Sequence, residues 1–228
     1  MNLNRRWRMI MKKISLIAFC LVLPLMLIYV NVVFAEELKS IQLPKPQLDG
    51  GKPLMQVLKE RKSAREFSSE KLPLQVLSNL LWAASGVNRP ESGRRTAPTA
   101  ANWQEMDIYV ATADGLYLYE PKSHQLKTIL GEDIRVLTGR QPFVKEAALN
   151  LIYVADFSRI GRGTNEERDF FSAADTGFIA QNVYLFCASE GLATVVRANI
   201  DRPTLGKTMK LGPDQRITLS QTVGYPKK

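Results

Sequence analysis

The stretch "NEERDFFSAADTGFIAQNVYLFCASEGL", residues 165–192, is the longest regular segment of the sequence. It opens with Asn165 and two glutamates, which favour a helix N-terminus, and Gly191 is a typical helix stop. Apolar residues cover most of its helical circumference. The stretch therefore predicts a long helix buried at the centre of the fold.

Shorter helices and strands are predicted on both sides of this segment. Period-two alternation predicts strands at 106–112, 115–121 and 124–130, joined by tight turns. A continuous apolar run at 150–157 predicts a buried strand. The remaining predictions are helices at 54–62, 72–86, 131–139, 142–149 and 202–211, strands at 193–200 and 216–226, and a loop at 88–104. This mixture predicts an α+β fold.

The first 35 residues have a different composition. Five basic residues precede "ISLIAFCLVLPLMLIYVNVVFA", an uncharged apolar run that ends in Ala35. This pattern predicts a secretory signal peptide over 1–35 and hence a periplasmic or extracellular protein. The alternative is an uncleaved membrane anchor, because residues 14–35 are long enough to span a bilayer. Proline and glycine punctuate 36–53, which predicts an extended arm before a single domain at 54–228.

The bulk charge says little about a partner. Removing the signal takes away five of the 31 basic residues and leaves a small excess over the 22 acidic ones. No lysine-rich run is present, so a nucleic-acid partner is not expected.

Few residues are available for side-chain chemistry. His124 is the single histidine, which excludes a histidine-cluster metal site and argues against a Ser-His-Asp triad, so no metal is expected. Cys187 is the one cysteine left after the signal, and we expect it to be a packed core thiol. An enzymatic role would therefore need an organic cofactor.

The short motif "RKSAREF", residues 61–67, gathers cations where a helix should be ending. Arg61, Lys62 and Arg65 could simply be a solvated helix end, because cations complement the negative pole of a helix. Alternatively, the two arginines and Ser63 suit an anion, because guanidinium groups and a hydroxyl match the oxygens of a phosphate. These residues alone leave both readings open.

The order of several motifs resembles a known family. "RKSAREF" is followed by "RTAPTAANWQ" at 95–104, "GFIAQNVYLFCASEGLATVV" at 177–196 and "VGYP" at 223–226. This set resembles the nitroreductase superfamily of flavin enzymes, and "DGLYLYEPKSHQL" at 114–126 is similar to its SagB-type dehydrogenase branch. The resemblance implies a nitroreductase-like fold, with a mainly antiparallel central sheet packed by helices and FMN at a homodimer interface.

The resemblance also implies roles for individual residues. Arg61, Ser63 and Arg65 would bind the phosphate and ribityl chain, whereas Lys62 would be solvated. The chain ends soon after "VGYP", so Lys227 or Lys228 would replace a further basic phosphate ligand of the family. The ring edge would be lined by Pro98, Thr99, Ala100, Asn102 and Gln104, and backbone amides of Val196, Arg197 and Ala198 would lie near flavin N5 and O4.

For two side chains, Arg197 and Trp103, two alternative roles remain open. Arg197 would stabilise negative charge at flavin N1 and O2, or would be a surface arginine. Trp103 would wall a substrate pocket, or would lie across the flavin and block it. The extra catalytic side chains of SagB-type azoline oxidases have no counterpart that we can place, so peptide-heterocycle oxidation does not carry over.

The predicted function is that of an exported FMN-dependent oxidoreductase. It would reduce nitro, quinone or similar acceptors, or oxidise an unknown small molecule. NADH or NADPH is the expected donor in the family, but an exported protein leaves that pool behind. The alternative is a non-enzymatic flavin or ligand carrier. The apolar residues of 165–190 reach too far round for one-sided burial, which predicts that this helix lies in a homodimer interface.

Overall fold

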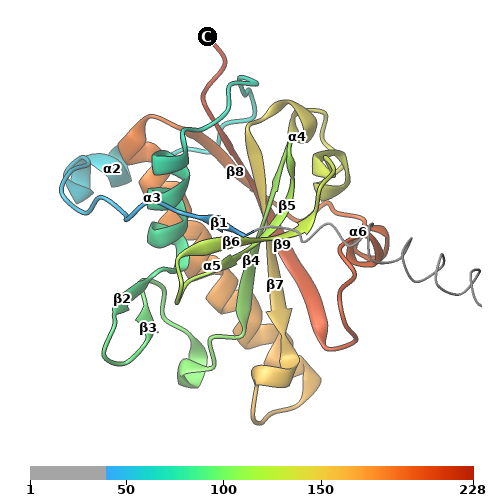
Figure 1. Ribbon diagram of the computed structural model, residues 1–228. Coiled ribbons are helices and arrows are strands. Elements are labelled where there is room, and N and C mark those ends of the chain that lie inside the picture. The colour runs from blue at the N-terminus through green and yellow to red at the C-terminus, as the bar shows by residue number, and fades with distance from the viewer. Residues whose placement is uncertain (1–39) are drawn as a thin grey trace, which may run out of the picture. The chain divides into compact units, whose positions relative to one another are not determined.

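The computed structural model describes residues 40–228, and its central feature is a seven-stranded sheet (Figure 1). The strand order is β1-β6-β5-β4-β7-β9-β8, and every neighbouring pair is antiparallel. This confirms the predicted α+β fold with an antiparallel central sheet. The strands are β1 (Ile41–Gln42), β4 (Met106–Thr112), β5 (Gly115–Glu120), β6 (Gln125–Leu130), β7 (Leu149–Asp156), β8 (Ala193–Arg197) and β9 (Gln215–Gly224).

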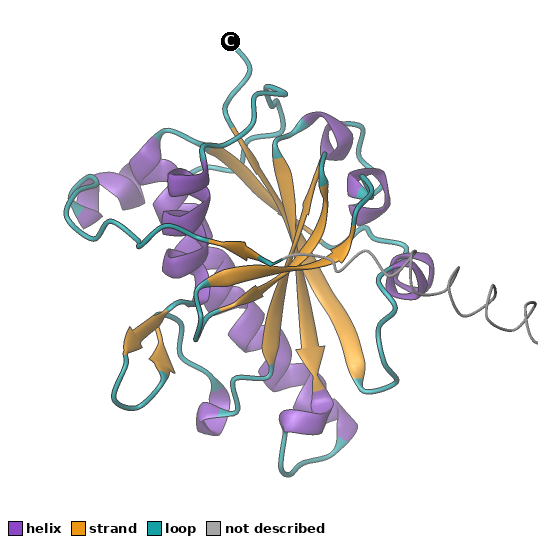
Figure 2. Ribbon diagram, viewed as in Figure 1, coloured by secondary structure: helices purple, strands orange, loops and turns teal. Residues whose placement is uncertain are grey.

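Helices cover both faces of the sheet (Figure 2). On one face, α3 (Leu74–Ser85) and α5 (Asn165–Glu190) enclose the larger core; on the other, the 3₁₀-helix η2 (Arg135–Thr138) and α6 (Arg202–Thr208) enclose a smaller one. Alternate residues of β7 enter the two cores: Tyr153 belongs to the first, and Ile152 and Val154 to the second. The continuous apolar run of β7 is thus explained by burial on both faces.

The long helix α5 begins and ends where the sequence predicted. Thr164 and Glu167 form a reciprocal capping box at its start, and Gly191 ends it with a left-handed φ of 71°. However, the helix is not buried all round, because Phe170 is 68% and Phe178 48% exposed. The apolar residues of α5 therefore lie on two faces. One face packs against the core, and the other is exposed to solvent in this chain.

Several predicted elements differ in extent. The loop at 88–104 contains a two-stranded hairpin, β2 (Val87–Arg89) and β3 (Arg94–Arg95), followed by the 3₁₀-helix η1 (Ala100–Asn102). The helix α2 (Leu54–Glu60) ends before the basic motif. The predicted helix at 142–149 shortens to α4 (Phe143–Glu146), because Leu149 already pairs with Thr112 in the sheet. The 3₁₀-helix η3 (Phe157–Arg159) follows β7.

β8 pairs with only half of β9. Its residues align with Ser220–Gly224, and the other half of β9 continues past the end of β8. There the guanidinium of Arg202 donates to Ile217 O at 2.9 Å and to Thr218 O at 2.6 Å. A side chain therefore occupies the open edge of β9.

The predicted signal peptide lies outside the described residues, as does the start of the 36–53 arm. From residue 40 the arm adds β1 to the edge of the sheet beside β6, and Gln47 N donates to Asn79 Oδ1 of α3. No helix within 40–228 is long and apolar enough to cross a bilayer.

Candidate functional site

The basic motif at 61–67 is an extended segment beside the edge strand β8. After α2 the chain straightens, and Ala64 N donates to Thr194 O of β8 at 3.0 Å. Arg61 is half-buried, whereas Ser63 and Arg65 are exposed. The motif is therefore anchored through its backbone, with its polar side chains free to reach a ligand.

Tyr184 of α5 joins this segment to β8. Its hydroxyl accepts from Val196 N at 3.0 Å and lies 2.9 Å from Ser63 Oγ, and the guanidinium of Arg61 lies 5.3 Å from its ring centroid. Either hydroxyl can be the donor in the Ser63–Tyr184 bond. When Tyr184 donates, the Ser63 hydroxyl hydrogen is available to another acceptor.

The cations around Tyr184 have no counter-charge within residues 40–228. Arg61, Lys62 and Arg65 form no ion pair there. A cleft of about 470 Å³ opens beside them, with Lys62, Tyr184 and Thr194 in its lining. Unpaired guanidinium groups with an exposed hydroxyl fit the oxygens of a phosphate. The donor set thus fits the phosphate end of FMN.

The C-terminus runs beside the same segment. Ser68 N donates to Tyr225 O at 2.9 Å, and Lys227 N donates to Glu66 O at 3.4 Å. A second hollow of about 760 Å³ is lined in part by Lys227 and Lys228. The structure thus brings both lysines near the basic motif, although they follow it by more than 150 residues in the sequence.

The small-residue segment 98–104 has an unusual backbone. Ala101, Asn102 and Gln104 have left-handed φ angles of 48°, 55° and 51°. Non-glycine residues adopt this conformation at a cost, so the segment must be held by its contacts. Thr99 Oγ1 accepts from Gln104 N at 3.1 Å, the Gln104 amide donates to Asn102 Oδ1 at 3.2 Å, and Pro98 is exposed.

This segment is docked on α5. Ala100 N donates to Asp175 Oδ2 at 2.9 Å, and the Trp103 ring meets Phe171 edge-on with centroids 5.7 Å apart. Trp103 is half-buried, so in this chain its indole covers part of the exposed face of α5.

The stretch Val196–Ala198 requires corrections. The Val196 amide, which the resemblance assigned to the flavin, donates to Tyr184 instead. The Arg197 side chain is neither a surface group nor free to reach a ligand: it is 5% exposed and donates to Thr138 O, Asn150 Oδ1 and Thr222 Oγ1. Burial lowers its pKa to about 10. Ala198 is exposed just after β8.

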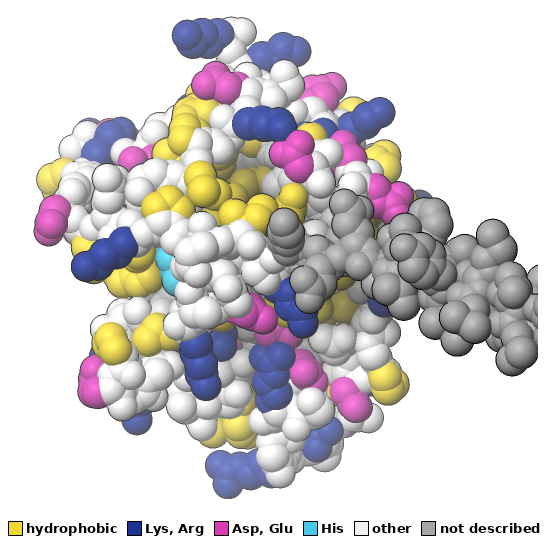
Figure 3. All heavy atoms as spheres, viewed as in Figure 1, with side chains coloured by type: hydrophobic (Ala, Val, Ile, Leu, Met, Phe, Trp, Pro, Cys, Tyr) yellow, Lys and Arg dark blue, Asp and Glu magenta, His cyan; other side chains and the backbone are white. Residues whose placement is uncertain are grey.

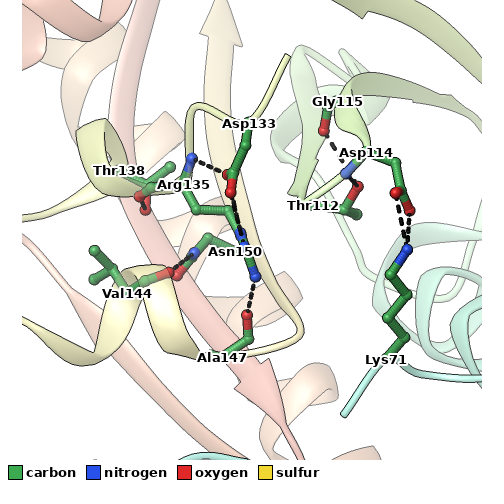
Figure 4. A network of polar contacts seen from close by, with 10 residues as sticks. All are labelled: Lys71, Thr112, Asp114, Gly115, Asp133, Arg135, Thr138, Val144, Ala147 and Asn150. Carbon is green, nitrogen blue, oxygen red and sulfur yellow. Dashed lines mark hydrogen bonds and ion pairs between the residues drawn. The ribbon is translucent and has the colours of Figure 1, made fainter. Parts of the chain in front are cut away.

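Arg197 is thus part of an internal polar network on the η2 side of the sheet. Two of its partners, Thr138 and Asn150, lie close together in Figure 4, where Asn150 donates to Val144 O at 2.7 Å. Arg135 beside them forms an ion pair with Asp133 at 2.7 Å. Inward-facing polar groups satisfy one another here, which is a structural role.

The two predicted halves of the flavin site lie on opposite flanks of α5. Asp175, which holds segment 98–104, and Tyr184, which holds the basic motif, are nine residues apart. Nine residues are two and a half turns, so the two side chains point to opposite sides and are about 13 Å apart along the axis. Figure 1 shows α2 and η1, which flank these two regions, toward opposite ends of α5. The body of α5 separates the two halves within one chain.

The remaining chemistry-bearing residues have structural surroundings. His124 Nε2 lies 2.7 Å from Ser78 Oγ, which donates to Pro44 O, and its Nδ1 lies 3.0 Å from the Tyr119 hydroxyl. Since Ser78 donates elsewhere, His124 does not act as its base. Cys187 is fully buried, as predicted. Within 40–228, no group of His, Cys, Asp and Glu could hold a metal ion.

Sequence reasoning missed three residues of this region: Glu105, Asp175 and Tyr184. Nothing in the sequence marks Tyr184 as a site residue, because a single aromatic residue on an apolar helix is normally interpreted as part of the core. Asp175 did carry one, because it is the single acidic residue between Asp169 and Glu190. A carboxylate in the middle of a packed helix needs a partner.

On the face shown in Figure 3, lysines and arginines are interspersed with acidic side chains rather than gathered in one patch. That face offers no continuous basic surface of the kind that nucleic-acid binding requires.

Comparisons with known proteins agree with this fold. The family model described as "Nitroreductase family" matches residues 58–225. A candidate nitroreductase of Methanocaldococcus jannaschii is 34% identical over 166 residues, which cover 68% of this chain and 83% of that protein. A crystal structure of a candidate nitroreductase from Ralstonia eutropha JMP134 is 46% identical with a TM-score of 0.79, and the match covers 83% of this chain and 90% of that one.

A further crystal structure, of a candidate nitroreductase from Desulfovibrio desulfuricans in complex with FMN, is 20% identical with a TM-score of 0.57. The match covers 78% of this chain and 88% of that one. The family model covers well over half of the sequence, and the archaeal relative is matched over most of its length. The chain therefore belongs to the nitroreductase family.

Proposed function

We propose that this protein is an FMN-dependent oxidoreductase. The observation that carries the proposal is the set of uncompensated donors around Tyr184: the Arg61 guanidinium, the Ser63 hydroxyl and the exposed Arg65. Membership of the nitroreductase family and the FMN complex of the Desulfovibrio relative support it. Bound there, the flavin would supply the electron-transfer chemistry that the side chains of this protein cannot.

The residues of the basic motif would hold the phosphate end. Arg61 offers a guanidinium already oriented by the Tyr184 ring, and Ser63 offers an exposed hydroxyl whose hydrogen is free when Tyr184 is the donor of their shared bond. Charge-assisted hydrogen bonds of this kind are about twice as strong as neutral ones. Arg65 and the C-terminal Lys227 or Lys228 would add positive charge around the same group.

Segment 98–104 would meet the ring end of the flavin in a second copy of the chain. One chain presents the basic motif and this segment on opposite flanks of α5, so a single flavin can use both only between two subunits. The placement of these two elements supports the proposal of a homodimer with flavin at its interface. Trp103 would form a wall of the substrate pocket beside the ring.

The open face of α5 is suited to that interface. Phe170 and Phe178 are exposed, and Gly177 lies between them with no atom within 4 Å of an added Cβ. Exposed aromatic side chains around a small residue allow a second helix to approach closely. We propose that α5 packs across the dimer axis.

The acceptor would be a nitro compound, a quinone or a similar small molecule. The N-terminal 35 residues support export, in which case NADH and NADPH would be out of reach and another donor would reduce the flavin. A branch assignment to the SagB-type dehydrogenases is supported by the "DGLYLYEPKSHQL" motif, which forms β5, its turn and the start of β6.

The test is reconstitution with FMN followed by anaerobic reduction. Purified protein should retain flavin absorbance after gel filtration, and reduced protein should be reoxidised in stopped-flow mixing by at least one of a nitroaromatic, a quinone or oxygen. Failure to retain FMN would overturn the flavin assignment. Retained flavin that no acceptor reoxidises and no donor reduces would identify a carrier instead.

A further inference from the structure

Two buried carboxyl groups lie beneath segment 98–104. Glu105 directly precedes β4 and is 0% exposed, and Asp175 of α5 is 2% exposed. Asp175 Oδ2 accepts from Ala100 N at 2.9 Å, so this carboxylate fixes the segment to α5. Neither carboxyl group forms an ion pair within residues 40–228.

The carboxyl group of Glu105 accepts no hydrogen bond within the described residues. Both of its carboxyl oxygens are buried without a hydrogen bond from any N–H or hydroxyl of the described chain. Its polar neighbours on α5 are the Asp175 carboxyl and the hydroxyl of Ser172. An ionised carboxylate buried in this way is strongly unfavourable, and two adjacent ones repel each other. A proton on one of the two carboxyls turns the repulsion into a hydrogen bond.

The charged groups on the surrounding elements are engaged elsewhere or unpaired. From β3, the half-buried Arg95 donates to Met106 O at 3.3 Å, and its charge also interacts with Glu105. From α5, the buried Nε of Arg168 has no acceptor. From η3, Arg159 is paired with Asp107 of β4 and with Asp156 of β7. None of these cations forms an ion pair with Glu105 or Asp175 within the described residues.

The direction of the titration agrees with this geometry. Burial raises the pKa of Glu105 to about 7, and the charge of Asp175 adds to that increase. Burial also raises the pKa of Asp175, against the opposing effect of the Ala100 N–H.

We propose that Glu105 keeps its proton below neutral pH and donates a hydrogen bond to Asp175, and that this carboxyl pair positions segment 98–104 on α5. Glu105 and Asp175 are then positioning residues, which act on the flavin only through the segment they hold. Loss of the proton to solvent would leave two negative charges in a dry site. Asp175 would move away from Glu105, and the Ala100 bond and the Trp103–Phe171 contact would loosen together.

The stability contribution has a defined sign. The folded pKa of Glu105 lies above its unfolded value of 4.5, so the contribution is fully present below pH 4.5 and is lost as the pH rises to about 7 and beyond. The effect of the Glu105–Asp175 pair on flavin binding rests on the proposed function. Its effect on the position of segment 98–104 does not depend on that function.

The experiment first uses the flavin-free full chain. Infrared spectra recorded between pH 6 and pH 9, where exposed carboxyls are almost fully ionised, would detect the C=O stretch of a buried protonated carboxylic acid, and Trp103 fluorescence would report the position of the segment. Trp103→Phe identifies the part of the emission that belongs to this residue. Glu105→Gln keeps the shape and donates an amide hydrogen to Asp175 at every pH. Glu91→Gln, on the exposed turn between β2 and β3, is the matched control.

We expect the wild-type chain and Glu91→Gln to lose the carboxylic-acid band and change Trp103 emission together, with a midpoint near pH 7. Glu105→Gln should lack the band and keep constant emission. If Glu105→Gln does not fold, Asp175→Asn serves instead, because an asparagine amide can donate to an ionised Glu105 and the band should again be absent. A wild-type chain with no such band at pH 6, or a band that persists in Glu105→Gln, overturns the proposal.

FMN titrations then separate this proposal from the proposed function. In the wild type, the FMN dissociation constant should rise by up to about tenfold per pH unit above the midpoint. In Glu105→Gln it should stay flat. A chain that titrates as described but binds no FMN at any pH would refute the flavin assignment and leave the carboxyl pair intact. A chain that binds FMN with the same pH dependence in Glu105→Gln would refute the carboxyl pair.

Discussion

The hydroxyl of Tyr184 lies 2.9 Å from Ser63 Oγ and so links the longest helix of the fold to a short motif more than 100 residues before it. The same oxygen accepts from Val196 N, which adds the edge strand β8. One phenol group therefore fixes the relative positions of the three segments around the basic motif.

Tyr184→Phe should weaken FMN binding and destabilise the fold. The Val196 N–H would lose its acceptor and Ser63 its hydrogen-bond partner, which together should lower the free energy of unfolding by about 1–3 kcal/mol. Urea unfolding and flavin-fluorescence titration measure the two effects. Tyr117→Phe, on β5 and separated from β8 by β4, β7 and β9, should leave FMN affinity unchanged.

Arg61→Ala should lower FMN affinity by about 1.5–3 kcal/mol, the scale of a charge-assisted hydrogen bond. Lys62→Ala should have a much smaller effect, because Lys62 is exposed and would be solvated. Flavin titrations of both variants at one salt concentration make the comparison. Equal losses would show that general basicity, not a specific site, attracts the ligand.

Gly177→Leu should convert the proposed homodimer to a monomer without unfolding the chain. No atom lies within 4 Å of a Cβ added at Gly177, so the new side chain meets space in the single chain and would clash only with a second helix. Light scattering gives the mass, and flavin retention should fall with it. Gly131→Leu, which is equally open but follows β6, is the control and should remain dimeric. A Gly177→Leu protein that stays dimeric would place the interface elsewhere.

His124→Ala should cost stability but not turnover. The variant removes the partner of Ser78 Oγ and of the Tyr119 hydroxyl and should lower the free energy of unfolding by about 1–2 kcal/mol. Burial lowers the pKa of His124 below 6.5, so its contribution is present above pH 6.5 and lost as the pH falls further. A large loss of turnover at unchanged flavin content would make His124 catalytic.

The α+β class and most element boundaries could be predicted because they rest on local patterns. The alternation in Met106–Thr112 and the capping residues of α5 are visible in the sequence, and the structure places both as expected. The central burial predicted for α5 holds on one face only, and the other face, which the apolar pattern assigned to a homodimer interface, is exposed in this chain. Phe170 and Ile179 are equally apolar, but only Ile179 is covered by this chain.

The candidate site was less predictable. Arg61 and Ser63 were identified through a motif, but the partner that orients them, Tyr184, lies on another element and has no motif of its own. Arg197 was misread because its surroundings come from η2, β7 and β9, which no spacing in the sequence connects. Side-chain direction at the end of a strand is a property of the assembled sheet.

Arg202, at the unpaired edge of β9, also protects the protein from aggregation with other copies of the chain. Unpaired strand edges are templates for aggregation, because a second chain can add to them by backbone hydrogen bonding. Arg202 occupies Ile217 O and Thr218 O with a charged group, so an incoming strand would have to displace it and bury its charge. In the proposed homodimer, two copies would meet through α5, and Arg202 would keep further copies from adding to β9.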